Sequence, residues 1–216
     1  MLLEMSLKNK KTAGFSLIEM VVVAAVILVV IAIALPSFKQ TLDGYRLDAS
    51  GRAVASLLQQ TRIQAARHNQ PFYAQIDTST TPNRAYANTD KSAFTEANAQ
   101  QNGEAVVYLD GDVGFQTTGL PDHTQLDALM NNGNTGAVGV ISGAIGFNAR
   151  GLPCTQGSSV GVCIEASNAA NYFEWFMQNK SNLGWEAVTV TPAGRIKFYR
   201  LTGTSSTSCG YPACWQ

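Results

Sequence analysis

The sequence predicts an α+β protein, with a long N-terminal helix followed by an antiparallel, β-rich head. The first observation is a run of 21 residues, from Phe15 to Leu35, in which Glu19 is the only charged side chain. The second is a series of short apolar segments after residue 71, bounded by Gly, Pro, Asn and Asp, as is typical of antiparallel sheets. The third is a total of 19 glycines with abundant Ser, Thr and Asn, which indicates many turns.

The composition argues against several classes of function. Only 14% of the 216 residues are charged, against about 25% in an average soluble domain. Lys plus Arg and Asp plus Glu both number 15, a balance that argues against a generally basic nucleic-acid-binding protein and against an acidic disordered tail. Two histidines and four cysteines leave little material for a metal centre or a histidine-dependent active site, so we expect no cofactor.

The apolar run has the length and composition of a membrane span. As an α-helix it would be about 31 Å long, close to the thickness of a hydrocarbon core. A buried core helix is usually amphipathic, whereas this segment is apolar on all sides. Because Lys8, Lys10 and Lys11 precede it, the positive-inside rule predicts a cytoplasmic N-terminus and places the chain after Pro36 outside the cytoplasm.

A cleaved secretory signal is the alternative for this segment. Ala32-Ile33-Ala34 offers a small-residue cleavage site. The run is longer than the roughly 7–15 residues of such signals, however, and a carboxylate at the centre of a membrane helix costs about 2.5–3.5 kcal/mol. No cation within the helix can reach Glu19, so its partner has to come from elsewhere.

The residues at the start of the run resemble a processing signal. The sequence KKTAG at 10–14 followed by FSLIE at 15–19 resembles the type III signal of type IV pilins and type II secretion pseudopilins. The resemblance implies that residues 1–14 are a leader peptide, which a membrane-embedded prepilin peptidase removes by cutting after Gly14. It also implies that the new N-terminal residue, Phe15, is N-methylated.

The same resemblance assigns roles within the helix. Residues 15–36 would be a transmembrane helix that later forms the filament core. Glu19 would pair with the N-terminal ammonium of a neighbouring subunit, which supplies the missing cation. Pro36, at a position where many pilins have proline, would kink the helix or locally melt it.

Residues 37–67 are expected to continue the helix as an amphipathic segment. The proposed apolar stripe recurs at spacings of three and four, and its members are Phe38, Leu42, Tyr45, Ala49 and Ala53, then Leu57 and Leu58. Acids alternate with the arginines on the other faces, which favours a solvated surface over a nucleic-acid-binding stripe. Asn69-Gln70-Pro71 ends the helix, and residues 68–216 are expected to form the β-rich head.

Strand character is confined to short segments of the head. These segments are 72–77, 105–110, 138–147, 160–166, 187–191 and 195–201. Residues 78–103 and 111–136 are polar and rich in turn formers, so we expect them to be looped or irregular. The segment 171–180 fits a strand or one face of a helix equally well.

Two strips of the head are similar to a narrower family. Residues 145–151 (IGFNARG) and 188–196 (VTVTPAGRI) look like the strand–turn patterns of FimT/GspH-type minor pilins and minor pseudopilins. The resemblance implies a structural subunit, at the tip or at initiation of a type IV pilus or a type II secretion pseudopilus. Plain hairpins produce similar patterns.

The four cysteines favour disulfides. Cys154 and Cys163 flank one loop, Cys209 and Cys214 flank another, and of the three possible pairings the sequence-local one is preferred. Closing such loops would stabilise the fold by roughly 2–3 kcal/mol each. A zinc site is the rival interpretation, but it lacks both C-x₂-C spacing and a nearby histidine.

No credible active site is visible, and we expect the protein not to be an enzyme. The sequence lacks a P-loop, a nucleophile elbow, a zinc-protease motif and a redox C-x-x-C. His68 lies at the helix end, and His123 beside Asp122 is better explained as a solvated loop than as part of a catalytic triad. Asp110-Gly-Asp112 is better explained as a turn than as a calcium site.

The segment 195–201 allows one sharper hypothesis. Alternation places Ile196 and Phe198 inward and the side chains of Arg195, Lys197 and Tyr199 outward on one face. Together with Arg200, these side chains resemble the basic motif of DNA-binding FimT minor pilins, in which cations bind phosphates and a ring stacks on a base. A charged edge strand that prevents aggregation is the favoured explanation, because the head is not basic overall.

The sequence therefore predicts a minor pilin or pseudopilin precursor. The expected partners are prepilin peptidase, other pilin or pseudopilin subunits and the inner-membrane assembly platform, with DNA as a further possibility. The expected location is the inner membrane, with one membrane pass, a cytoplasmic N-terminus and a periplasmic head, before assembly into the filament. A secreted β-rich binding protein with a cleaved signal peptide is the alternative from another class.

Overall fold

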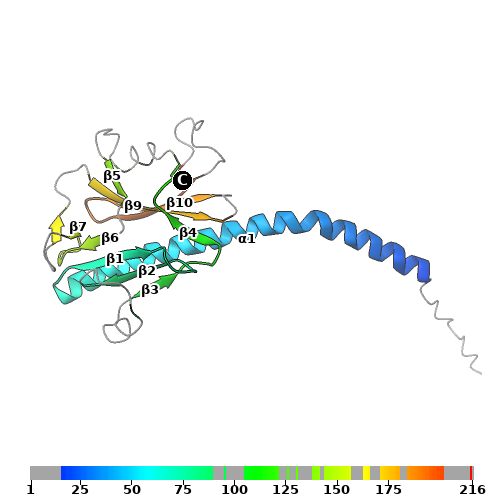
Figure 1. Ribbon diagram of the computed structural model, residues 1–216, viewed down its shortest axis with the longest axis horizontal. Coiled ribbons are helices and arrows are strands. Elements are labelled where there is room, and N and C mark those ends of the chain that lie inside the picture. Colours follow the sequence, from blue (N-terminus) through cyan, green and yellow to red (C-terminus); the bar gives the residue numbers. More distant parts are fainter. Residues whose placement is uncertain are drawn as a thin grey trace, which may run out of the picture. The chain divides into compact units, whose positions relative to one another are not determined.

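A single long helix precedes the strands in the computed structural model of the protein. The structure describes residues 16–89, 95, 105–121, 126, 130, 138–141, 144–156, 163–165, 171–180, 184–201 and 215. The helix, α1, spans Leu17–His68, and strands β1 to β11 follow it along the chain (Figure 1). The chain divides into two units, the first ending at Thr41 and the second beginning at Leu42, so α1 contributes to both.

The first sheet of the second unit is antiparallel throughout. Its strand order is β3-β2-β1-β6-β7-β8, which places the β1–β2 hairpin beside β6. Its strands are β1 (Phe72–Asp77), β2 (Arg84–Asn88), β3 (Val106–Tyr108), β6 (Ala144–Phe147), β7 (Pro153–Gln156) and β8 (Cys163–Glu165).

The second sheet is antiparallel along its main path. The order is β11-β10-β9-β4, and β5 is added to β9 as a parallel neighbour. Its strands are β4 (Val113–Gln116), β5 (Val138–Ile141), β9 (Asn171–Asn179), β10 (Trp185–Val190) and β11 (Ile196–Arg200).

The second half of α1 shares one core with both sheets. The helix residues in this core are Leu47, Val54, Leu57, Leu58 and Ala65. They pack with apolar side chains from strands of both sheets, among them Ile145 and Phe147 of β6 and Trp175 and Met177 of β9. A second, smaller core lies on the other face of the second sheet and consists of Leu126, Phe176, Ala187, Tyr199, Leu201 and Trp215. The second sheet is therefore covered on both faces.

The buried face of α1 differs from the predicted stripe over its first turns. Tyr45 and Ala49 are exposed, with Tyr45 at 70%, whereas Leu47 is fully buried. The predicted burial of Leu57 and Leu58 further along the helix agrees with the structure. The face that meets the sheets passes through small residues, Ser50 and Gly51 among the buried set, which let the helix approach closely.

Two predictions for α1 concern the effect of Pro36 and the end of the helix before Pro71. A kink or local melting was expected at Pro36, and the helix is continuous there, without local melting. It ends as expected before Pro71: Asn69 adopts a left-handed conformation with φ 52°, and the Gln70 amide donates to the Ala65 carbonyl at 3.2 Å. This is the bond pattern of a Schellman cap, which satisfies a carbonyl that the helix leaves open.

Three expectations for the strands were wrong or incomplete. The irregular segments 78–103 and 111–136 contain β2 and β4, respectively. The single strand expected at 138–147 is two strands in different sheets, and the ambiguous segment 171–180 is a strand, β9. β2 has a polar sequence, RAYAN, but it pairs with both β1 and β3, and these long-range partners stabilise it.

Candidate functional site

The basic residues predicted to contact DNA divide between two faces of the second sheet. Arg195 is exposed just before β11, and the Lys197 ammonium lies 5.6 Å from the centroid of the Tyr199 ring. Tyr199 is only 8% exposed, because it belongs to the second core, so the expectation that its ring faces solvent was wrong. Base stacking on this ring is therefore not available in the observed fold.

Arg200 lies on the opposite side of β11 and faces α1. A Cβ added at Gly44 of the helix would be 3.0 Å from Nη2 of Arg200. Ile196 and Phe198 of β11 pack against the main core, as their predicted inward orientation requires. Alternation along the strand thus separates Arg200 from Lys197.

The two strips that carry the FimT/GspH-like patterns meet in space. Gly151 in the β6–β7 turn and Gly194 in the β10–β11 turn have φ values of 74° and 77°, which favour glycine. A Cβ at Gly194 would lie 2.9 Å from the Gly151 carbonyl oxygen. Arg62 of α1 donates a hydrogen bond from Nη1 to the Gly194 carbonyl at 2.9 Å. The helix therefore holds together two turns that are about 40 residues apart in the sequence.

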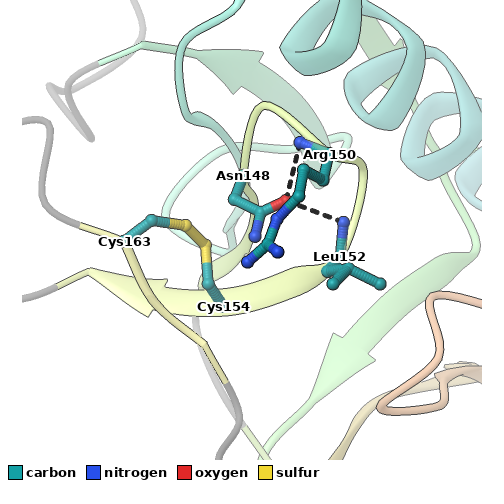
Figure 2. The surroundings of a disulfide bond; sticks show 5 residues. All are labelled: Asn148, Arg150, Leu152, Cys154 and Cys163. Atoms are coloured by element: carbon teal, nitrogen blue, oxygen red, sulfur yellow. Dashed lines mark hydrogen bonds between the residues drawn. A yellow bond between two sulfur atoms is a disulfide. The ribbon is translucent and has the colours of Figure 1, made fainter.

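A disulfide joins Cys154 of β7 to Cys163 of β8 (Figure 2). Beside it, Asn148 Oδ1 accepts hydrogen bonds at 2.9 Å from the backbone amides of Arg150 and Leu152 (Figure 2). These bonds fix the tight turn between β6 and β7. The other predicted pair, Cys209 and Cys214, lies outside the described residues.

A buried acid, Glu186, lies where α1 packs on the second sheet, beside an ion pair of the helix that is partly exposed. Glu186 of β10 is fully buried on the face that meets the helix. Asp48 and Arg52 of α1 form an ion pair beside it, with 2.8 Å between Arg52 Nε and Asp48 Oδ2. Burial, and then the negative charge of Asp48, raise the pKa of Glu186 to about 8. The raised pKa favours the neutral form of this carboxyl at pH 7.

The described residues contain no metal-binding cluster of three or more His, Cys, Asp and Glu side chains. Asp110 and Asp112 instead face Arg46, with a shortest distance of 2.8 Å from Arg46 Nη1 to Asp112 Oδ2. The His68 ring lies 5.6 Å from the Phe72 ring at the end of α1. Asp122 and His123 lie outside the described residues.

The first half of α1 is an apolar helical segment whose only acidic residue is Glu19. The large apolar side chains from Leu17 to Leu35 are exposed in the isolated chain, and Glu19 lies in the first turn. The helix is long and apolar enough to cross a membrane. Gly14 and Phe15, the predicted cleavage and methylation residues, lie outside the described residues.

Residues 9–35 match the family model described as the prokaryotic N-terminal methylation motif. This match covers the junction at Gly14 and Phe15, the acid at Glu19 and the apolar helix up to Leu35. Its N-terminal segment therefore carries the methylation motif of prokaryotic pilins. Pilins and pseudopilins are structural subunits and not enzymes. The motif implies processing by prepilin peptidase and assembly with other pilin subunits.

One solved structure similar to this chain is the minor pseudopilin EpsH from the type 2 secretion system of Vibrio cholerae. The two share 11% sequence identity with a TM-score of 0.37, and the alignment covers 71% of this chain and 95% of EpsH. No curated protein matches the chain.

The sequence pattern does not reveal the contacts between α1 and the two hairpin turns. The alternation of acids and arginines predicts a solvated face for Arg62, whereas its guanidinium reaches the Gly194 carbonyl. The sequence does indicate the unusual position of Glu186, because strand alternation places this acid on the same face as Val188 and Val190. An acid on an otherwise apolar strand face indicates a buried carboxyl.

Proposed function

We propose that this chain is a minor subunit of a type IV pilus or a type II secretion pseudopilus, acting at the tip or at initiation. Prepilin peptidase cuts it after Gly14, and Phe15 becomes the methylated N-terminus. The observation that carries this proposal is the methylation motif over residues 9–35 with Glu19 in the apolar helix. The similarity of residues 145–151 and 188–196 to FimT/GspH patterns supports a minor rather than a major subunit.

Assembly follows from the chemistry of the N-terminal helix. In the bilayer the apolar side chains contact lipid, and the apolar run from Phe15 to Leu35 contains no cation that could pair with Glu19. In a filament the helix exchanges lipid for neighbouring helices, and the Phe15 amine of another subunit neutralises Glu19. Opposite charges attract strongly where the dielectric constant is low, but only subunits in the correct register bring this pair together.

The N-terminus of the mature protein is the direct test. Mass spectrometry should find a chain that begins with N-methylated Phe15. A chain that begins at Leu35, after cleavage at Ala34, would support an exported β-rich binding protein and refute the pilin proposal.

The role of Glu19 is tested by replacing it with alanine. We expect Glu19→Ala to insert into the membrane normally and to be incorporated poorly into filaments, as measured by membrane fractionation and by immunoblots of sheared filaments. Met20→Ala, at the next position of the same exposed helix, is the control and should be incorporated normally. Normal incorporation of Glu19→Ala would contradict the proposed pairing.

The proposed location is the inner membrane, with the N-terminus in the cytoplasm and the head in the periplasm, where the assembly platform can engage the subunit. Lys8, Lys10 and Lys11 support this orientation. The disulfide between Cys154 and Cys163 supports an oxidising compartment for the head. Added protease should digest the head in spheroplasts, and protection of the head would refute this topology.

DNA binding is a second candidate function, limited to Arg195 and Lys197. These two cations lie on the same side of the β11 strand, and Arg195 is exposed. Without an accessible Tyr199 ring, the contact would be to phosphates and would weaken with salt. Gel shifts of the full chain in detergent should show salt-sensitive binding that Arg195→Ala and Lys197→Ala reduce, while the control Lys180→Ala retains it. Absence of salt-sensitive binding by the wild type would eliminate this candidate.

A further inference from the structure

A carboxyl group without hydrogen bonds lies where α1 passes over the β10–β11 hairpin. Glu186 is fully buried, and neither carboxyl oxygen has a hydrogen-bond partner among the described residues. Gly51 of α1 leaves the room for it: a Cβ at this position would be 2.6 Å from Glu186 Oε2 and 2.9 Å from Cδ2 of Phe198. The helix therefore rests on the sheet through Gly51, Glu186 and Phe198, a contact that we call the helix seat.

The charged groups around Glu186 come from two elements. Asp48 and Arg52 lie on α1, and Arg200 is the register partner of Glu186 on β11. On the other side, the register partner on β9 is the uncharged Met177. Arg200 and Arg52 attract the charged form of Glu186 and so lower its pKa, but Arg52 forms its ion pair with Asp48.

This arrangement suits a neutral carboxyl and not a carboxylate. A buried carboxylate requires several hydrogen bonds or a paired cation, and the seat supplies neither. Arg52 also lies over the Phe198 ring, 5.7 Å from its centroid, so moving it toward Glu186 would disturb the seat. Ionisation of Glu186 therefore requires either entry of water or a rearrangement of the arginines.

We propose that Glu186 is a protonation switch for the helix seat. With the carboxyl neutral, α1 packs against β10 and β11 at Gly51. When Glu186 is ionised, either Arg52 leaves Asp48 or Arg200 moves toward the Glu186 carboxylate. The segment of α1 around Gly51 then opens to solvent. The switch works within the head and is independent of filament assembly.

The expected pH dependence follows from linkage. The pKa of Glu186 is about 8 in the folded head and near 4.5 when the carboxyl is exposed to water. Between these values the open state releases the proton that the closed state keeps, so opening becomes about tenfold more favourable per pH unit. Below about pH 4.5 the seat is most stable, and above about pH 8 the effect levels off.

Hydrogen exchange of the full chain in detergent tests the switch. After correction for the intrinsic exchange rate, the α1 peptide containing Gly51 should lose protection by about tenfold per pH unit between about pH 5.5 and 8. Glu186→Gln, which keeps a neutral polar group, should make the protection independent of pH. The control Asp112→Asn, which removes an exposed acid paired with Arg46, should leave the pH dependence unchanged.

Two further measurements keep the proposal open to refutation if Glu186→Gln fails to fold. Asp48→Asn removes a negative charge that raises the pKa of Glu186. The pH above which exchange no longer changes should therefore be lower in this variant. Carbon-13 NMR of the glutamate carboxyl groups in the wild type should find one that is neutral at pH 7. An ionised Glu186 at pH 7, or equal pH dependence in the wild type and Glu186→Gln, would overturn the proposal.

Discussion

Replacing Gly51 by alanine measures how closely α1 approaches the β10–β11 hairpin. In a helix interior, alanine is favoured over glycine by about 1 kcal/mol. At Gly51, however, the new methyl group would lie 2.6 Å from Glu186 Oε2 and 2.9 Å from Phe198 Cδ2, and Phe198 Cε2 is closer still. Overpacking of this kind costs about 1–3 kcal/mol. We therefore expect Gly51→Ala to destabilise the head by about 1–2 kcal/mol after the gain in helix propensity is subtracted.

Gly44 offers a matched control in the same helix. The nearest atom to a Cβ at Gly44 is Nη2 of Arg200, at 3.0 Å, and this is the end of a flexible side chain that can move. Gly44→Ala should therefore keep most of the helix-propensity gain and stabilise the head by about 0.5–1 kcal/mol. The same substitution is thus expected to have opposite signs at two positions seven residues apart.

Urea unfolding of the full chain in detergent, followed by tryptophan fluorescence, supplies the two free energies. Trp175 lies in the main core, so its emission reports on loss of that core. If Gly51→Ala stabilises the protein as much as Gly44→Ala does, the close helix–sheet contact does not exist in solution. The same result would remove the geometric basis of the proposed switch at Glu186.

Three further predictions concern the stability of the head. Leu58→Ala should lower the free energy of unfolding in urea by about 2–4 kcal/mol because Leu58 is fully buried. Ile63→Ala, at a side chain 62% exposed, should lower it by less than about 0.5 kcal/mol. Equal losses would contradict the observed burial of the Leu58 face of α1. Hydrogen bonds from a nearby serine, and then Arg84, hold the pKa of Asp77 below its usual value, so Asp77 stabilises the fold above about pH 4 and loses this effect as the pH falls. Urea unfolding of the wild type and an asparagine variant at this position should therefore converge at low pH, and a constant difference would refute the assignment. Replacing both cysteines of the β7–β8 disulfide by serine should cost about 2–3 kcal/mol in thermal or urea unfolding, and no change would show that the bond does not restrain the unfolded chain.

The sequence alone predicted the features that depend on local chemistry. An apolar run of 21 residues with one acid defines a membrane-length helix whatever the rest of the chain does, and the motif around Gly14 and Phe15 is contiguous. β1 has the predicted bounds, Phe72–Asp77, because its apolar residues lie between clear turn signals. The end of α1 was equally predictable, since Asn69 and Pro71 stop a helix by their own backbone preferences.

Strand periodicity predicted which side chains of β11 share a face, but it did not predict the burial of both faces. Along β11 it correctly separated Ile196 and Phe198 from Lys197 and Tyr199. It could not show that the second face is covered as well, because the covering residues Leu126 and Trp215 come from other parts of the chain. The proposed site for DNA therefore has no accessible aromatic ring, because Tyr199 is buried in the second core.

Tertiary structure alone decided which of two neighbouring faces of α1 is buried. The stripe through Tyr45 and Ala49 and the one through Leu47 and Val54 both repeat at helical spacing, and the sheets pack on the second. The reason is steric, because Gly51 on that side allows the closest approach to the sheet. Periodicity determines which side chains share a face, whereas burial of that face depends on segments distant in the sequence. Alternation likewise places Glu186 on the face of Val188 and Val190, but its burial depends on packing against α1.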